Sequence, residues 1–255
     1  MRASSLALLV FIAVGLAPIA NAQVIPLPAK DQKVIDAKLG PGVVGQALAS
    51  KPLPDPSVYF PLEEKVRSYQ ATAGSKSGQT VDLDVAKGKR PNGTPAWRFE
   101  LAPGLLGFLH QTKSGDLVMP AMADMDEGLV VVMTPPNPFF IKGMKPGATR
   151  TESQSVSVDS LDDPSDQRYS GKLENSFTYV GTYRVSVPAG TYDAVLLRHG
   201  FKGKIGPADT TDLAYYLLAP GVGIVAMITQ EDIEAFWLLH VDTSTGKVLS
   251  ASSSP

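Results

Sequence analysis

The sequence contains no cysteine among its 255 residues. This excludes disulfide bonds, and it excludes a lipid-modified cysteine at a processed N-terminus. Small secreted domains often need disulfides, but a chain of this length can bury enough apolar surface without them. The absence therefore fits a periplasm-like compartment and a fold stabilised by a hydrophobic core.

The sequence also lacks a concentration of positive charge. Lys and Arg number 23 against 25 Asp and Glu, which gives a formal net charge of −2. Nucleic-acid binding usually requires a concentrated basic surface. The composition therefore argues against a nucleic-acid partner.

Long apolar runs are missing except near the N-terminus, where residues 6–17 read LALLVFIAVGLA. This run is shorter than the roughly 20 residues that span a bilayer. Arg2 precedes it, and Ala20-Asn21-Ala22 offers small residues at positions −3 and −1 of a cleavage site. We predict a signal peptide over residues 1–22, with an uncleaved N-terminal anchor as the alternative. No twin arginine is present, so the general secretion route is expected. The expected product is periplasmic or secreted and does not span a membrane after cleavage.

Residues 23–62 are rich in Pro and Gly and predict an N-terminal arm. Within it, Lys30–Leu39 has the apolar spacing of a short helix that Gly40-Pro41 would end. A second short helical stretch is expected over Val43–Ala49. The prolines of residues 51–56 require an extended chain, because each disfavours helix at the residue before it.

Residues 63–250 show a period of two, which is typical of strands with one solvated face. Trp97, Phe99 and Leu101, for example, alternate with charged neighbours. The runs Leu129–Met133 and Val222–Ile228 are apolar on both faces and predict central strands. Turn signals recur between the strands, Ser244-Thr-Gly246 among them. The pattern predicts one all-β, mainly antiparallel domain, an open or half β-barrel or sandwich, followed by a disordered tail at 251–255.

Sequence stretches that match catalytic or cofactor-binding motifs lack the surrounding residues that those motifs require. Gly221-Val-Gly223 has the letters of a dinucleotide-binding loop, but Pro220 precedes it and a β-branched run follows, so a turn into a buried strand is expected. His110, His199 and His240 are far apart and have no metal-ligand spacing. We assign no catalytic residue, metal ligand or cofactor. A dispersed Ser-His-Asp triad stays open, because its members need not be near in sequence.

Aromatic residues on the expected strands favour binding over catalysis. Five of them are candidate ligand-binding residues: Trp97, Phe99, Tyr192, Tyr215 and Trp237. In a barrel with a cavity they would contact a lipid or another hydrophobic molecule. In a closed sandwich they would simply be core.

The C-terminal third carries two distinctive turns, Val187-Pro-Ala-Gly-Thr-Tyr192 and Ala219-Pro-Gly-Val-Gly223. Their pairing over residues 168–249 resembles a set of exported proteins of Gram-negative bacteria with half-barrels like the lipoprotein carrier LolA. The resemblance implies an envelope-associated half-barrel with an apolar cavity. It supplies no catalytic residues.

Three hypotheses follow. The first is a non-enzymatic periplasmic protein that binds a hydrophobic ligand or an envelope protein. The second is a secreted hydrolase with a dispersed catalytic site. The third is a structural or assembly factor that uses an exposed sheet edge. The oligomeric state is left open.

Overall fold

The computed structural model describes residues 22–235 and 239–252, and the predicted signal peptide lies outside this part of the chain but for its last residue, Ala22. Antiparallel strands make up most of it. The strands are β1 (Gln23–Val24), β2 (Val44–Ser50), β3 (Lys65–Ala73), β4 (Thr80–Lys89), β5 (Pro95–Ala102), β6 (Leu105–Gln111), β7 (Leu117–Asp124), β8 (Leu129–Phe140), β9 (Thr149–Ser160), β10 (Gln167–Val187), β11 (Gly190–Ile205), β12 (Ala208–Ala219), β13 (Gly223–Ala235) and β14 (Leu239–Ser252). The helices are α1 (Ala29–Leu39) and the short 3-10 helix η1 (Pro56–Val58).

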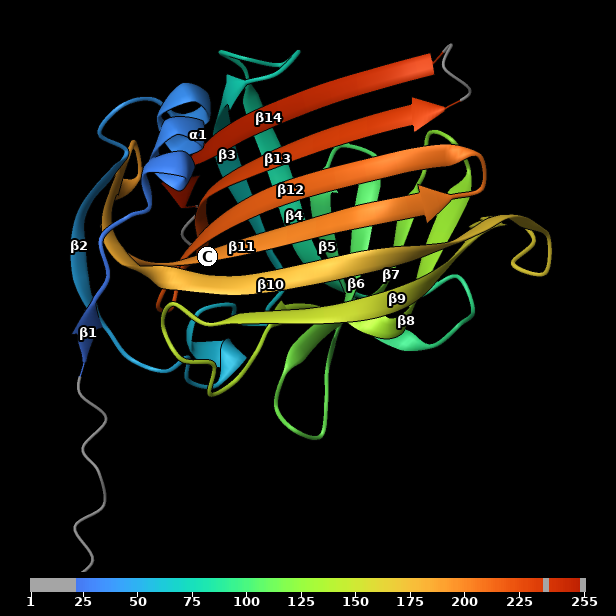
Figure 1. Ribbon diagram of the computed structural model, residues 1–255, viewed down its shortest axis with the longest axis horizontal. Coiled ribbons are helices and arrows are strands. Elements are labelled where there is room, and N and C mark those ends of the chain that lie inside the picture. Colours follow the sequence, from blue (N-terminus) through green and yellow to red (C-terminus); the bar gives the residue numbers. More distant parts are fainter. Residues whose placement is uncertain (1–21, 236–238, 253–255) are drawn as a thin grey trace, which may run out of the picture.

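The strands close into a barrel. Within the described residues, β3 to β14 form a ring of twelve strands, in which β9 pairs with β10 and β14 pairs with β3 (Figure 1). The prediction of an all-β, antiparallel fold is confirmed, but the open or half barrel is wrong. The β14–β3 and β9–β10 ladders join the two halves of the sheet, and closure leaves the ring with no free edge of its own.

The 21-residue strand β10 has a different partner along each part of its length on one side. Its first part, residues 167–178, pairs with β9. Its later part pairs with β2, with Tyr183 opposite Ala47 and Val185 opposite Val44. The helix expected over Val43–Ala49 is therefore wrong, because this segment is held as strand β2 by hydrogen bonds to β10. Strand β1 extends β2 outside the ring.

Helix α1 confirms the helix expected at Lys30–Leu39 and begins one residue earlier. It packs on the outer face of β3, β13 and β14 (Figure 1). The turn expected at Ser244-Thr-Gly246 is wrong, because these residues lie within β14. A Cβ at Gly246 would overlap the carbonyl oxygen of Lys38, so glycine here permits the helix to approach the sheet. Within the described chain, no helix has the length and apolar character to cross a membrane.

Strand β13 confirms one of the two expected doubly covered strands, since residues 224–228 are all buried. One of its faces lies under α1 and the other lines the barrel interior. The expectation is wrong for Leu129–Met133 of β8, where only Val130 and Met133 are buried.

Aromatic side chains fill one end of the barrel. Phe60, just after η1, contacts Phe99 and Phe139 with ring centroids 5.4 and 5.2 Å away, and Phe99 and Phe139 lie 5.9 Å apart. This end, which holds η1 and the loops after β6 and β8, is called the closed end below. At the opposite end, called the mouth, the interior is less completely filled.

Candidate functional site

A cavity of about 180 Å³ lies inside the barrel toward the mouth. One wall comes from β11–β14 and the other from β5–β8. The second wall is largely apolar and consists of Leu101, Ala102, Leu105, Met119, Met122, Asn137 and Phe139. An apolar cavity with a few converging polar groups is the usual form of a small-molecule site.

The wall from β11–β14 is built in three rows across four strands, set by the ladder register. Because side chains alternate between faces, residues two apart on each strand point into the same cavity. The deep row is Leu197, Tyr216, Met227 and Lys247; the middle row is His199, Ala214, Thr229 and Thr245; the outer row is Phe201, Asp212, Glu231 and Thr243. Aliphatic and aromatic side chains dominate the deep row, while the outer row carries two carboxyl groups.

His199 is the most deeply buried ionisable group of this wall, at 3% exposure. Its ring lies 4.6 Å from Phe177 and 5.2 Å from Tyr216, measured between centroids. Burial lowers the pKa of His199 to about 3, so the imidazole is neutral at pH 7. Its Nε2 atom has no hydrogen-bond partner among the described residues. A buried polar atom without a partner is uncommon and calls for an explanation.

Asp212 stands directly opposite Glu231 in the β12–β13 ladder. Burial, together with the negative charges of Glu231 and Asp232, raises the pKa of Asp212 to about 7. Its Oδ1 atom is buried and has no hydrogen-bond partner in the described chain. The outer row thus places two like-charged groups side by side, with one acceptor unused.

Lys247 is 5% exposed at the deep end of the cavity. Its Nζ donates a hydrogen bond to the carbonyl oxygen of Leu101, 3.3 Å away. Burial lowers the pKa of Lys247 to about 8, with a smaller contribution from Lys76. Burial also raises the pKa of Tyr216, so four ionisable groups with displaced pKa values line one cavity, a combination typical of functional sites.

The predicted aromatic residues of β5 do not line this cavity. Trp97 is half-buried, with Lys87 Nζ 5.8 Å from its ring centroid. Phe99 belongs to the aromatic cluster of the closed end and contacts Phe139, which does line the cavity. Trp237 lies outside the described residues.

The two predicted tyrosines lie elsewhere. Tyr192 follows the β10–β11 turn, and its hydroxyl donates to the carbonyl oxygen of Ala189 at 3.0 Å. Tyr215 is fully buried on the outer face of the barrel, where its hydroxyl donates to Asp31 of α1 at 2.9 Å. Its neighbour Tyr216 points inward and lines the cavity.

The sequence interpretation did not select His199, Asp212 or Lys247. A usable signal was present, since Asp212, Ala214 and Tyr216 alternate with residues of the other face, as do His199 and Phe201. Polar residues at inward positions of a long strand indicate a polar interior. The sequence alone does not say which of the two faces is the inner one.

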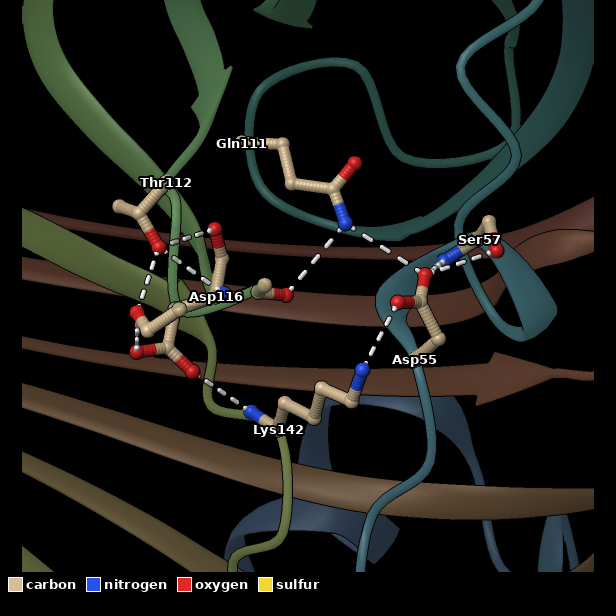
Figure 2. A network of polar contacts seen from close by, with 8 residues as sticks. Asp55, Ser57, Gln111, Thr112, Asp116 and Lys142 are labelled. Atoms are coloured by element: carbon tan, nitrogen blue, oxygen red, sulfur yellow. Dashed lines mark hydrogen bonds and ion pairs between the residues drawn. The ribbon is translucent and has the colours of Figure 1, made fainter.

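A second group of polar side chains, at the closed end of the barrel, forms a hydrogen-bond network around Asp55 (Figure 2). Asp55 accepts hydrogen bonds from the backbone N and the hydroxyl of Ser57, which lower the pKa of its carboxyl, and its Oδ2 lies 3.3 Å from Lys142 Nζ. Gln111 donates to Asp55, and Asp116 accepts from the backbone N of Lys142 at 2.8 Å. These partners are exposed and satisfy one another, so the network fastens η1 to the neighbouring loops.

A larger hollow of about 310 Å³ lies on the outside, between residues 48–54 and strands β10 and β11. Its charged lining residues, Lys51 and Asp193, are exposed. The interior cavity is the better candidate, because its residues His199 and Lys247 are buried, and His199 and Asp212 have unused polar atoms.

Comparison with known proteins adds little to this geometry. No protein family matches the sequence. No curated protein matches it either. Among solved structures, a putative lipoprotein from Parabacteroides distasonis is similar, with 14% identity and a TM-score of 0.36 over 76% of this chain and 98% of the other. The resemblance to LolA-like carriers is not confirmed by these comparisons.

Proposed function

We propose that the barrel binds a small amphipathic molecule in its interior cavity. The observation that carries this proposal is the combination of apolar walls with buried polar atoms that have no partner. These atoms are Nε2 of His199 and Oδ1 of Asp212, and both residues line the cavity. Leaving such groups unsatisfied costs roughly 1–3 kcal/mol each, and a ligand with matching polar groups would remove that cost.

The cavity sets the size of the apolar part. An apolar cavity of about 150 Å³ is large enough for benzene. The cavity here, at about 180 Å³, suits a body of one ring or a short branched chain. The wall residues Met119, Met122 and Phe139 would contact that body, because thioether and aromatic side chains adapt well to small apolar ligands.

The proposed place of action is the periplasm or the extracellular space. The N-terminal pattern of Arg2, an apolar run and Ala20-Asn21-Ala22 supports export. A binding protein for a diffusible molecule, or for an envelope partner that presents one, is consistent with such a location.

The geometry favours binding over the hydrolase alternative. A triad requires the histidine to be hydrogen-bonded to a nucleophilic hydroxyl. In the described structure, Nε2 of His199 has no such partner. The nearby hydroxyls of Thr229 and Thr245 are bonded to each other at 2.7 Å.

The test is to fill the cavity. Ala214 lies in the middle row, and Ala214→Phe would occupy the space of a one-ring ligand. Titration of the wild-type protein with 2-phenylethanol, followed by calorimetry and by chemical shifts of cavity residues, is expected to show saturable binding that Ala214→Phe abolishes. Met125→Phe places the same side chain on an exposed turn and serves as the control. Equal binding by wild type and Ala214→Phe would contradict the proposal.

A further inference from the structure

The outer row of the cavity wall carries an excess of negative charge. Asp212 and Glu231 are direct neighbours across the β12–β13 ladder, and like charges in such a pair destabilise the sheet. Thr243 completes the row, and its hydroxyl donates to Glu231 Oε2 at 3.4 Å. A cation between the two carboxyl groups would remove their repulsion.

The unused polar atoms of the cavity can both accept a hydrogen bond. Oδ1 of Asp212 is a carboxyl oxygen, and Nε2 of the neutral His199 imidazole is an acceptor in one of its two tautomers. His199 is 97% buried, and it is a diagonal neighbour of Asp212 on the same face, because it pairs with Ala214. Such neighbours lie roughly 7–8 Å apart at their Cα atoms. One donor group on a ligand can reach both side chains.

The turns at the mouth carry the same sign of charge. The described turns between β3 and β4, β5 and β6, β7 and β8, β9 and β10, and β11 and β12 hold the exposed acidic residues Asp126, Glu127, Asp162, Asp163 and Asp166, against one basic residue, Lys76. Asp166 is paired with Arg168 of β10 at 2.8 Å, and the other four acidic residues leave these turns with a net negative charge, which raises the local concentration of cations. Organic cations would therefore be attracted to the mouth, and carboxylates repelled.

We propose that the ligand is an organic ammonium, whose charged nitrogen lies between Asp212 and Glu231 and whose apolar body extends inward toward Tyr216 and Phe139. This inference rests on the proposed function and specifies the ligand class of the same cavity. The ammonium donates hydrogen bonds to the carboxyl oxygen of Asp212 that has no other partner. Charge-assisted bonds of this kind are among the stronger ones in proteins.

The cation in the deep row does not prevent this arrangement. Lys247 lies four residues along β14 from Thr243 of the outer row, a separation of about 13 Å at the rise of a strand. Its Nζ is bonded to the carbonyl oxygen of Leu101, next to the β5–β6 turn. This hydrogen bond fixes the ammonium of Lys247 at Leu101, and two adjacent carboxyl groups oppose its repulsion of a bound ammonium.

The protonation of Asp212 gives a second consequence. The ionisable groups that face it are His199 from β11, Glu231 and Asp232 from β13, and Lys247 from β14. Burial holds the pKa of Asp212 at about 7, so part of the population is neutral at pH 7. An ammonium favours the ionised carboxyl and lowers that pKa, so binding releases a proton near neutral pH.

The experiment compares three probes of one shape: 2-phenylethylamine, 2-phenylethanol and 3-phenylpropionate. We expect the amine to bind the wild-type protein at least about tenfold more tightly than the alcohol, and the carboxylate to bind most weakly. Asp212→Asn is expected to remove about tenfold of the amine affinity while binding of the alcohol is unchanged. Asp209→Asn is the control, since Asp209 is exposed on the same strand and paired with Lys204 at 3.2 Å.

Two further measurements keep the test decisive if Asp212→Asn folds poorly. Glu231→Gln should weaken the amine in the same way, and calorimetry in buffers of different ionisation enthalpy should detect proton release by the wild-type protein at pH 7. Equal binding of amine and alcohol, or tightest binding of 3-phenylpropionate with loss in Lys247→Met, would overturn the ammonium inference and leave the proposed cavity function standing. Failure of all three probes to bind would overturn both.

Discussion

Nη1 of Arg198 lies 2.7 Å from each carboxyl oxygen of Asp31, which joins the outer face of β11 to helix α1. The next residue on the strand, His199, points to the opposite face and into the cavity wall. The helix and the cavity thus lie on opposite faces of the same strand. Changes on the two faces can be examined separately.

The Asp31–Arg198 ion pair is expected to hold α1 on the barrel. Asp31 is fully buried and also accepts a hydrogen bond from the hydroxyl of Tyr215. Asp31→Ala leaves the partly buried Arg198 without its partner, a change that typically costs about 3 kcal/mol or more. We expect a loss of about 3 kcal/mol in the free energy of unfolding, measured with urea.

The double variant Asp31→Leu with Arg198→Met removes both charges and keeps an apolar contact. It should recover most of the loss, because apolar replacement of such a pair is often neutral. A single variant as stable as the wild type would show that the pair does not anchor the helix.

Glycine at position 246 is expected to be required for α1 to pack closely on the barrel. A Cβ here would overlap backbone atoms of Lys38, which cannot move without shifting the helix. Gly246→Ala should therefore lower the unfolding free energy by about 1–3 kcal/mol, as overpacking does. Gly88→Ala is the control, because its Cβ would meet Arg98 Cβ at an ordinary 3.7 Å. Similar melting temperatures for the two variants would refute this account.

Phe60 is expected to stabilise the closed end. It is 4% exposed and makes edge contacts with Phe99 and Phe139. Phe60→Ala removes these contacts and leaves a cavity, at a cost of about 3–5 kcal/mol. Val58→Ala, two residues earlier at an exposed site, should change the unfolding free energy by less than about 0.5 kcal/mol. Equal losses of unfolding free energy in Phe60→Ala and Val58→Ala would contradict a specific role for the Phe60 ring.

His199 should reduce stability in acid. Its pKa falls from 6.5 in the unfolded chain to about 3 in the folded protein, so the unfolded state binds the proton first as pH falls. The cost develops below pH 6.5, at up to about 1.4 kcal/mol per pH unit. His199→Phe removes it, and the unfolding free energy of this variant relative to wild type should rise between pH 6.5 and 4.5. A pH-independent difference would contradict the neutral, buried imidazole.

Asp212 should show the opposite dependence. Its pKa rises from 3.8 in the unfolded chain to about 7 in the folded protein, so the folded state is favoured by the neutral carboxyl below pH 3.8 and loses that advantage as pH rises to 7. Asp212→Asn does not ionise. Its unfolding free energy relative to wild type should therefore rise between pH 4 and 7 and stay constant above pH 7.5. Urea titrations at four pH values would measure this, and a flat difference would show an exposed, ordinary carboxyl.

Local pattern was sufficient for much of the fold. The alternation of Trp97, Phe99 and Leu101 predicted a strand, and β5 covers all three. The run that ends at Gly40-Pro41 predicted α1. Gly221 and Gly223, which have φ angles of 71° and 96°, form the expected turn into β13. These features depend on neighbouring residues and on the left-handed conformations that glycine allows.

Features that depend on distant partners were not predictable in this way. Val43–Ala49 has no strong preference of its own and becomes a strand because β10 pairs with it. Closure of the barrel depends on β14 meeting β3, a contact between segments that lie far apart in sequence. The prediction of the site residues failed for a similar reason, because the sequence does not show which face of β12 is the inner one. Tyr215 was therefore selected, although Tyr216 is the residue that faces the cavity.

The shared side of β10 has a consequence for how the chain assembles. Strand β2 can pair with β10 only after Val185, the partner of Val44, has been made. The side of β3 that does not pair with β4 can pair only after β14 has been made. Without β10 to β14, strands β3 to β9 can pair only with one another, which leaves both edges of that group unpaired. Loop-closure entropy is lost before the long-range ladders form, a topology that makes folding slow. The C-terminal strands therefore close the barrel, because β10 pairs with β9 and β14 pairs with β3.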